Sequence, residues 1–174
     1  MAQVLHGWQP GPDAVRPGCY NSPVMRIALG ADHAGVALKA DVQALLESRG
    51  ITIVDMGTVS EESVDYPDYA AQVGRAVASG EVDSGILVCG TGLGMAIAAN
   101  KVPGVRAVPV VDRESTRLGR AHNDANILAL GARVTPSALA LDLVTTFLDT
   151  PFEGGRHQRR LDKIAALEQR QTPA

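Results

Sequence analysis

Five short apolar runs between residues 26 and 131 constrain the fold of this chain more than any other feature. They are RIALGA (26–31), ITIVDM (51–56), SGILVC (84–89), VRAVPVV (105–111) and NILALG (126–131). The stretches between them carry apolar residues at helical spacing, as expected when strands and helices alternate. Such alternation produces right-handed crossovers and a parallel sheet that helices cover on both faces. We therefore predict a three-layer α/β/α, Rossmann-like domain with a five-stranded, mostly parallel sheet.

The two ends of the chain differ from this pattern. Residues 1–24 show no periodicity and contain the only Trp, so we expect a loosely ordered N-terminal extension. A helix is predicted from about Gly155 to Gln171, outside the alternation. No linker or repeat divides residues 25–174, which we interpret as a single domain. Only 3% of residues are aromatic, so its core must consist of Ala, Val, Leu and Ile.

Charge and cysteine content exclude several classes of protein. The net charge of −3 provides no broad basic field, which argues against nucleic acid as a partner. Two cysteines, Cys19 and Cys89, cannot form a disulfide framework. The apolar runs are too short to span a membrane. The first 24 residues lack the basic start and apolar segment of a secretory signal, so a cytoplasmic location is expected.

The glycine-rich loop CGTGLG, Cys89 to Gly94, directly follows the third apolar run. Glycines let backbone N–H groups approach a ligand closely, and a helix that starts here would favour an anion. The spacing is neither the dinucleotide fingerprint nor a phosphate-binding Walker loop, so no cofactor is expected. A tight strand–helix turn without a ligand would explain the glycines equally well.

Cys89 stands at the head of this loop. A thiol at a helix N-terminus is deprotonated more readily than a free one, and a thiolate can act as a nucleophile or as a base. The alternative is a small buried side chain at the end of a strand, which is how most free cysteines behave.

Three histidines and two arginines within residues 25–174 are further candidates. His33 follows the first strand, His122 precedes the fifth, and His157 lies in the motif GGRHQRR. No spacing among these histidines and the cysteines matches a zinc site, so no metal is predicted. Arg156 and Arg160, four residues apart on the last predicted helix, would hold a phosphate or would form a solvated basic face.

Taken in order, five motifs resemble the ribose-5-phosphate isomerase B family, which includes the galactose-6-phosphate isomerase subunits. They are GADHAG, DYP (Asp65 to Pro67), CGTGLGMAIAANK (89–101), HNDANILALG (122–131) and EGGRHQRR (153–160). The resemblance spans about residues 26–168. It implies an aldose–ketose isomerase of the non-oxidative pentose phosphate pathway, acting on ribose 5-phosphate through an enediolate.

The resemblance also implies roles in proton transfer. Cys89 would be the base that moves a proton between C2 and C1, and Thr91 would relay hydroxyl protons. Backbone N–H groups of Gly90, Gly92 and Gly94 would hold the enediolate. His122, with Asp32 nearby, would assist opening of the sugar ring. Another branch of the family has a glutamate base where this chain has Met95, so the chain resembles the cysteine type.

Binding roles follow from the same resemblance. Tyr66 and Asn123 would bind sugar hydroxyls, and Asn100 would complete the substrate contacts. The phosphate would be held by His33, Arg156 and Arg160. Members of the family are homodimers with the active site at the subunit interface, so a homodimer or larger homo-oligomer is the expected assembly. No cofactor or metal is implied.

Other functions stay open at this point. The substrate could be another sugar phosphate, such as a tetrose, allose or galactose phosphate. The chain could instead be a non-catalytic sugar-phosphate-binding module, although such a module needs no base. A thiol hydrolase that uses Cys89 and His122 is a further alternative, without a feature that favours a covalent intermediate.

Overall fold

The predicted parallel sheet is confirmed by the computed structural model, which describes residues 24–169. Its strands are β1 (Arg26–Ala31), β2 (Thr52–Asp55), β3 (Ser84–Cys89), β4 (Ala107–Pro109) and β5 (Ile127–Gly131). All four neighbouring pairs are parallel, in the order β2-β1-β3-β5-β4. The central strand β3 is therefore flanked by β1 and β5, and the carboxyl ends of all strands lie at one edge of the sheet.

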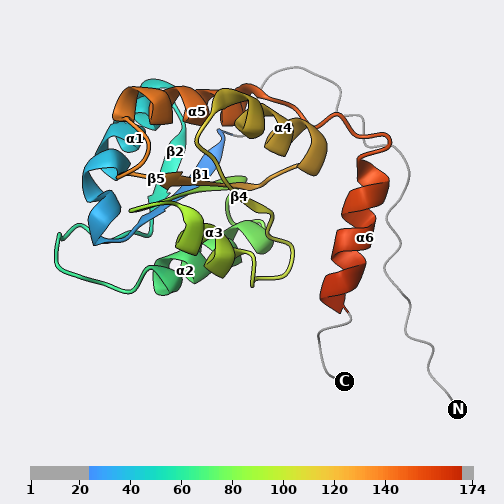
Figure 1. The fold of residues 1–174 in the computed structure, drawn as a ribbon, viewed down its shortest axis with the longest axis horizontal. Coiled ribbons are helices and arrows are strands. Elements are labelled where there is room, and N and C mark those ends of the chain that lie inside the picture. The colour runs from blue at the N-terminus through green and yellow to red at the C-terminus, as the bar shows by residue number, and fades with distance from the viewer. Residues whose placement is uncertain (1–23, 170–174) are drawn as a thin grey trace, which may run out of the picture.

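Helices cover both faces of this sheet, which makes the three predicted layers (Figure 1). They are α1 (Val36–Ser48), α2 (Tyr66–Ala78), α3 (Leu93–Ala99), α4 (Arg113–Asn123), α5 (Ser137–Asp149) and α6 (Gln158–Gln169), with a short 3-10 turn (His33–Gly35) before α1. Helices α1, α4 and α5 lie on one face, and α2 and α3 on the other. Helix α6 stands to one side of this body.

Two apolar clusters fill the space between the layers. Residues that alternate along β1, β3 and β5 point to α1 and α5 on one face and to α2 and α3 on the other. Small side chains such as Ala28, Ala70 and Ala129 are fully buried, so the α2–α3 layer lies close to the sheet. Cys89 and Met95 both belong to this second cluster.

Several predicted boundaries differ from the observed ones. The run 105–111 provides only the short strand β4, which lies at the edge of the sheet, where the missing N–H of Pro109 is tolerated. Helix α6 begins at Gln158, so Arg156 lies in the turn before it and not on the same helix as Arg160. The predicted extension over residues 1–24 lies, apart from Val24, outside the described residues. Within residues 24–169, none of the helices has the length and apolarity that a membrane span requires.

One close approach between the 3-10 turn and β3 predicts a difference in stability between two glycine substitutions. A Cβ at Gly35 would lie 2.6 Å from the carbonyl oxygen of Val88, so Gly35→Ala should lower the free energy of unfolding by about 1–3 kcal/mol. A Cβ at Gly119, inside α4, would lie 3.4 Å from Val108, an ordinary contact. Gly119→Ala should therefore be neutral or stabilising by up to about 1 kcal/mol, because alanine favours a helix. Urea unfolding of both variants measures this difference, and equal effects would contradict it.

Candidate active site

One group of the functional residues predicted from the sequence lies at the carboxyl end of β3. The loops that follow β1 and β5 are hydrogen-bonded to this end of the strand. The amide of Asp32 donates to Val88 O (3.2 Å), that of Ala132 to Cys89 O (2.8 Å), and that of Arg133 to Gly90 O (2.9 Å). The carboxyl ends of parallel strands are where ligands bind in open α/β sheets. The structure thus brings Asp32, His33 and the glycine loop together at the carboxyl end of β3.

The Cys89 thiol lies at the bottom of this group, with only 4% of the residue exposed. The amide of Gly92 donates to Cys89 Sγ at 3.1 Å. Gly92 adopts φ +78°, a left-handed conformation that favours glycine, and this conformation turns its N–H toward the sulfur. The sulfur is therefore part of the apolar core and has one backbone N–H group aimed at it.

Tyr66 packs against the glycine loop, and Thr91 is part of this loop. A Cβ at Gly94 would lie 2.7 Å from the Tyr66 ring, so the ring packs directly on the first turn of α3. Thr91 is exposed, and its hydroxyl oxygen accepts a long hydrogen bond of 3.4 Å from Leu93 N. The hydroxyl groups of Tyr66 and Thr91 therefore both lie at the loop that begins with the buried thiol. Met95, the residue after Gly94 on the same turn of the helix, is fully buried.

Asp32 and His33 have different local partners. Asp32 is 6% exposed, and one of its carboxylate oxygens accepts from Ala34 N at 2.9 Å, which caps the 3-10 turn. His33 Nδ1 accepts from Val64 N at 3.3 Å. In a neutral imidazole this leaves the proton on Nε2, so Nε2 is the nitrogen that can donate to a ligand.

Arg133 is a member of this group that the sequence analysis missed. Its guanidinium lies against Gly90, where a Cβ would be 3.4 Å from Nη1, and the residue is exposed. The position of Arg133 just after the fifth apolar run was the available signal, because Asp32 and Cys89 stand at the corresponding ends of their strands. An exposed guanidinium beside the glycine loop can contact an anion bound there.

The remaining predicted residues lie at the other end of the strands, beyond their amino ends, in the same chain. Helix α4 runs back from the carboxyl edge, so His122 and Asn123 lie near the amino end of β4, where Arg106 Nε donates to Asn123 O at 3.1 Å. Arg156 and Arg160 are exposed in and after the turn that leads to α6. Within one chain, the structure therefore does not bring His122 to Asp32 or Cys89, although the three were expected to act together.

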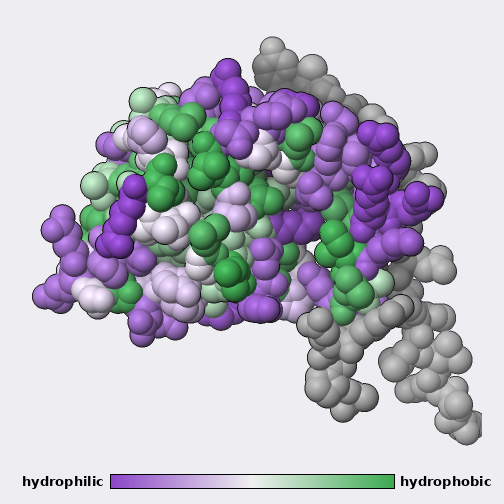
Figure 2. Space-filling view, viewed as in Figure 1, coloured by the Kyte–Doolittle hydropathy of each residue, from purple (hydrophilic) through white to green (hydrophobic). Residues whose placement is uncertain are grey.

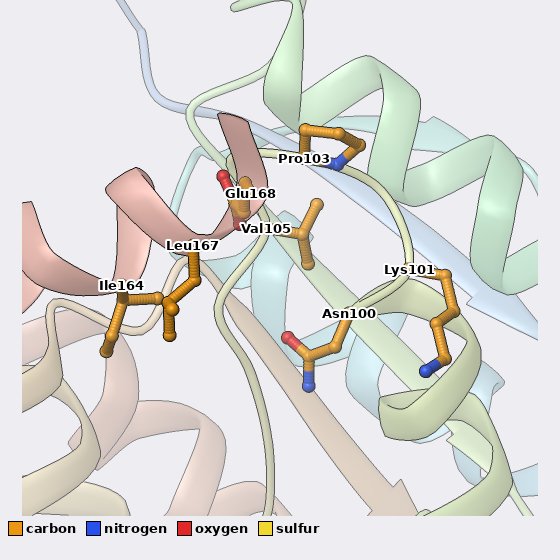
Figure 3. A pocket seen from close by; sticks show the side chains of 7 residues that line it. All are labelled: Asn100, Lys101, Pro103, Val105, Ile164, Leu167 and Glu168. Carbon is orange, nitrogen blue, oxygen red and sulfur yellow. The ribbon is translucent and has the colours of Figure 1, made fainter. Parts of the chain in front are cut away.

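Asn100 also lies at the amino edge, where its side chain already has two partners. It donates to Ala107 O and accepts from Ala107 N, both at 2.8 Å, and so attaches the start of β4 to the end of α3. A nearby cavity of about 530 Å³ separates the turn after α3 from α6 (Figure 3). Its lining residues are Asn100, Lys101, Pro103, Val105, Ile164, Leu167 and Glu168. This cavity contains none of the residues around Cys89.

His122 is in contact with two residues that had no predicted role in catalysis. Its ring stacks on that of His157, with centroids 4.1 Å apart and planes inclined by 8°. Glu153 Oε2 lies 3.6 Å from His122 Nε2 and 3.8 Å from His157 Nε2. Burial lowers the pKa of His157 below the usual value for histidine, and the charges of His122 and Arg156 lower this pKa further.

Comparison with known proteins identifies this arrangement. A family model described as Ribose/Galactose Isomerase matches residues 27–164. The chain belongs to this family. The resemblance seen in the motifs is thereby confirmed, and the chain is an isomerase and not a non-catalytic binding module.

Three relatives in this isomerase family match nearly their whole length. The ribose-5-phosphate isomerase B of Escherichia coli (strain K12) is 52% identical over 145 residues, which are 83% of this chain and 97% of the relative. The structure of Clostridium thermocellum ribose-5-phosphate isomerase B is 51% identical with a TM-score of 0.84, and covers 85% of this chain and 100% of its own. That of Mycoplasma genitalium ribose-5-phosphate isomerase B, solved with bound ribulose-5-phosphate, is 40% identical with a TM-score of 0.81; the match covers 85% of this chain and 98% of its own.

The position of Arg133 leads to a prediction for this isomerase. Arg133→Gln should raise KM roughly 10- to 150-fold, because a charge-assisted contact to a substrate anion contributes about 1.5–3 kcal/mol. Steady-state kinetics on a sugar phosphate measure the effect. Arg113→Gln is the matched control, since Arg113 is exposed at the start of α4 and pairs with Asp142. A KM that is equal in wild type and Arg133→Gln would show that Arg133 does not contact the substrate.

Proposed function

We propose that this protein interconverts ribose 5-phosphate and ribulose 5-phosphate, with Cys89 as the base. The observation that carries the proposal is the buried Cys89 thiol, which accepts the Gly92 N–H at the carboxyl end of the central strand. A relative with this fold binds ribulose-5-phosphate, and another that is 52% identical is a ribose-5-phosphate isomerase B. The reaction would belong to the non-oxidative pentose phosphate pathway in the cytoplasm.

The reaction needs a base, an anion site and no cofactor. The Cys89 thiolate removes the proton from C2 of the open-chain aldose, a double bond forms between C1 and C2, and O1 takes the negative charge. Backbone N–H groups of the loop that contains Gly90 and Gly94 stabilise this enediolate. Thr91 relays the hydroxyl proton from O2 to O1. The thiol then returns its proton to C1, and the ketone remains at C2.

Ring opening precedes this proton transfer, since ribose 5-phosphate is mostly a furanose. A base must take the proton of the O1 hydroxyl while an acid protonates the ring oxygen. His122 is the proposed group, because an imidazole exchanges protons near neutral pH. Asp32 would assist it, and Tyr66 and Asn123 would hold the sugar hydroxyls.

We further propose that each active site is built from two chains. The residues around Cys89 and those around His122 lie at opposite edges of the sheet, so one chain alone cannot supply both to one substrate. In a twofold homodimer the amino ends of the strands of one chain can face the carboxyl ends of those of its partner. The twofold symmetry then produces two equivalent active sites. The phosphate would then meet His33 and Arg133 from one chain and Arg156 and Arg160 from the other. Asn100 would contact substrate at the same interface.

Exposed apolar side chains support this assembly. Leu93 and Ile97, four residues apart on α3, are 56% and 64% exposed. Ile164 and Leu167 on α6 are 42% and 57% exposed. Figure 2 shows hydrophobic residues along the side of α6 that faces the body of the molecule. Such side chains are typical of a surface that another chain covers.

The base assignment predicts a loss of turnover without loss of binding. Cys89→Ala should lower kcat/KM on ribose 5-phosphate at least about 100-fold, since general base catalysis contributes roughly 10²–10⁴. Calorimetry should show that the variant still binds the sugar phosphate. Cys19→Ala is the matched control and should keep full activity. A panel of C4, C5 and C6 sugar phosphates completes the test, because a higher kcat/KM on a tetrose or hexose would replace the proposed substrate.

The shared site predicts that two inactive variants restore each other. Cys89→Ala and His122→Asn, unfolded together and refolded at equal concentrations, should recover about a quarter of wild-type activity. Half of the dimers are then mixed, and each mixed dimer has one site with both native residues. If both residues served the same site from one chain, mixing would restore nothing. Each variant refolded alone provides the baseline.

A further inference from the structure

The ring of His122 lies between two side chains of the segment that joins α5 to α6. His122 belongs to the last turn of α4, and the amide of Glu153 donates to the carbonyl of its neighbour Ala121 at 2.9 Å. This hydrogen bond fixes the start of the motif EGGRH (153–157) beside the end of the helix. The reaction proposed above gives no role to the side chains of Glu153 and His157.

His157 fixes the plane of the His122 ring. The amide of His157 donates to Gly154 O at 3.0 Å, so the segment turns back toward α4. The two imidazole rings are stacked, with centroids 4.1 Å apart and planes inclined by 8°. Since His157 is 4% exposed, the ring against which His122 packs has little freedom to move.

Glu153 determines which nitrogen of His122 carries the proton. A stacked ring can still rotate by half a turn about its bond to Cβ, so the stack alone does not place the nitrogens. Glu153 Oε2 lies 3.6 Å from His122 Nε2, within ion-pair distance, and the Glu153 side chain is 51% exposed and has room to close this distance to a hydrogen bond. An ionised carboxylate only accepts, so the neutral ring carries its proton on Nε2 and its lone pair on Nδ1.

His157 does not compete with His122 for this carboxylate. Its Nε2 lies 3.8 Å from Glu153 Oε2 but accepts from Arg156 Nε at 3.4 Å, so it has no proton to donate to Glu153. Burial lowers the pKa of His157, and the charges of His122 and Arg156 lower this pKa further. His157 is therefore neutral near neutral pH, and the negative charge of Glu153 acts on His122.

We propose that Glu153 is a positioning residue that holds the proton of His122 on Nε2 and leaves Nδ1 to exchange protons with the sugar. The part in ring opening rests on the proposed function, whereas the position of the proton does not. Nδ1 takes the proton of the O1 hydroxyl, the bond from C1 to the ring oxygen breaks with its electron pair on oxygen, and the proton passes from Nδ1 to that oxygen. Between the two transfers the ring is an imidazolium, which the carboxylate opposite Nε2 stabilises.

The tautomer of His122 is measured by ¹⁵N NMR of the full chain at about pH 8, above the pKa of about 6.5 of a free histidine. The His122 signals, assigned by their loss in His122→Asn, should show the proton on Nε2 in wild type and a mixture of tautomers in Glu153→Ala. Glu114→Ala is the matched control, since Glu114 is an exposed carboxylate at the start of the same helix and pairs with Arg117. It should leave the wild-type tautomer. A proton on Nδ1 in wild type, or an equal ratio of tautomers in wild type and Glu153→Ala, would overturn the proposal.

A double-mutant cycle on ribose 5-phosphate tests whether Glu153 acts through His122. Glu153→Ala should lower kcat/KM at least about tenfold, mainly through kcat, because Glu153 does not contact the substrate. His122→Asn/Glu153→Ala should be as active as His122→Asn, since the ring that Glu153 holds is already absent. Losses that multiply, or full activity of Glu153→Ala, would overturn the proposal. A wild type that does not turn over ribose 5-phosphate would contradict the proposed function alone, because the NMR result is independent of it.

Discussion

The carboxyl end of β3 is the part of the structure on which the candidate site depends. Carbonyl groups at and just after its end accept hydrogen bonds from the residues that follow β1 and β5, so two other loops are fixed beside the glycine loop. Gly131 shows how closely they approach, since a Cβ there would lie 2.6 Å from the carbonyl carbon of Thr91. A side chain at this position would push the glycine loop away from the sheet. The central position of β3 and the small residues beside it therefore place the thiol, its Gly92 donor and Arg133.

The same close packing determines the environment of the thiol. Cys89 lies in the apolar cluster of α2 and α3, where alanines and valines leave little room for water. In such a region an N–H aimed at sulfur acts more strongly than it would in water. In the reaction that we propose, the Cys89 sulfur would therefore meet the substrate with little competition from solvent.

In the mechanism that we propose, the distribution of polar side chains links catalysis to assembly. Cys89 and the glycine loop lie at the carboxyl ends of the strands, and His122 and the arginines of the last motif lie at the amino ends. Neither group is sufficient for isomerisation as we propose it. Dimer formation would then complete two sites at once, and the stacked pair of His122 and His157 with Glu153 would lie at the interface.

The sequence by itself determined the elements of the fold and the local chemistry of the glycine loop. Alternating runs and helical spacing report burial along a single segment, which is why the five strands and the parallel sheet could be predicted. The predicted boundaries of β4 and of α6 differ from the observed ones, because burial does not decide where these two elements begin and end. Tertiary structure alone decided which distant residues meet: Arg133 over Gly90, Asn100 with Ala107, and His122 with Glu153. Periodicity shows that a side chain faces inward or outward, but it carries no information on its partner, because a partner depends on how separate elements pack.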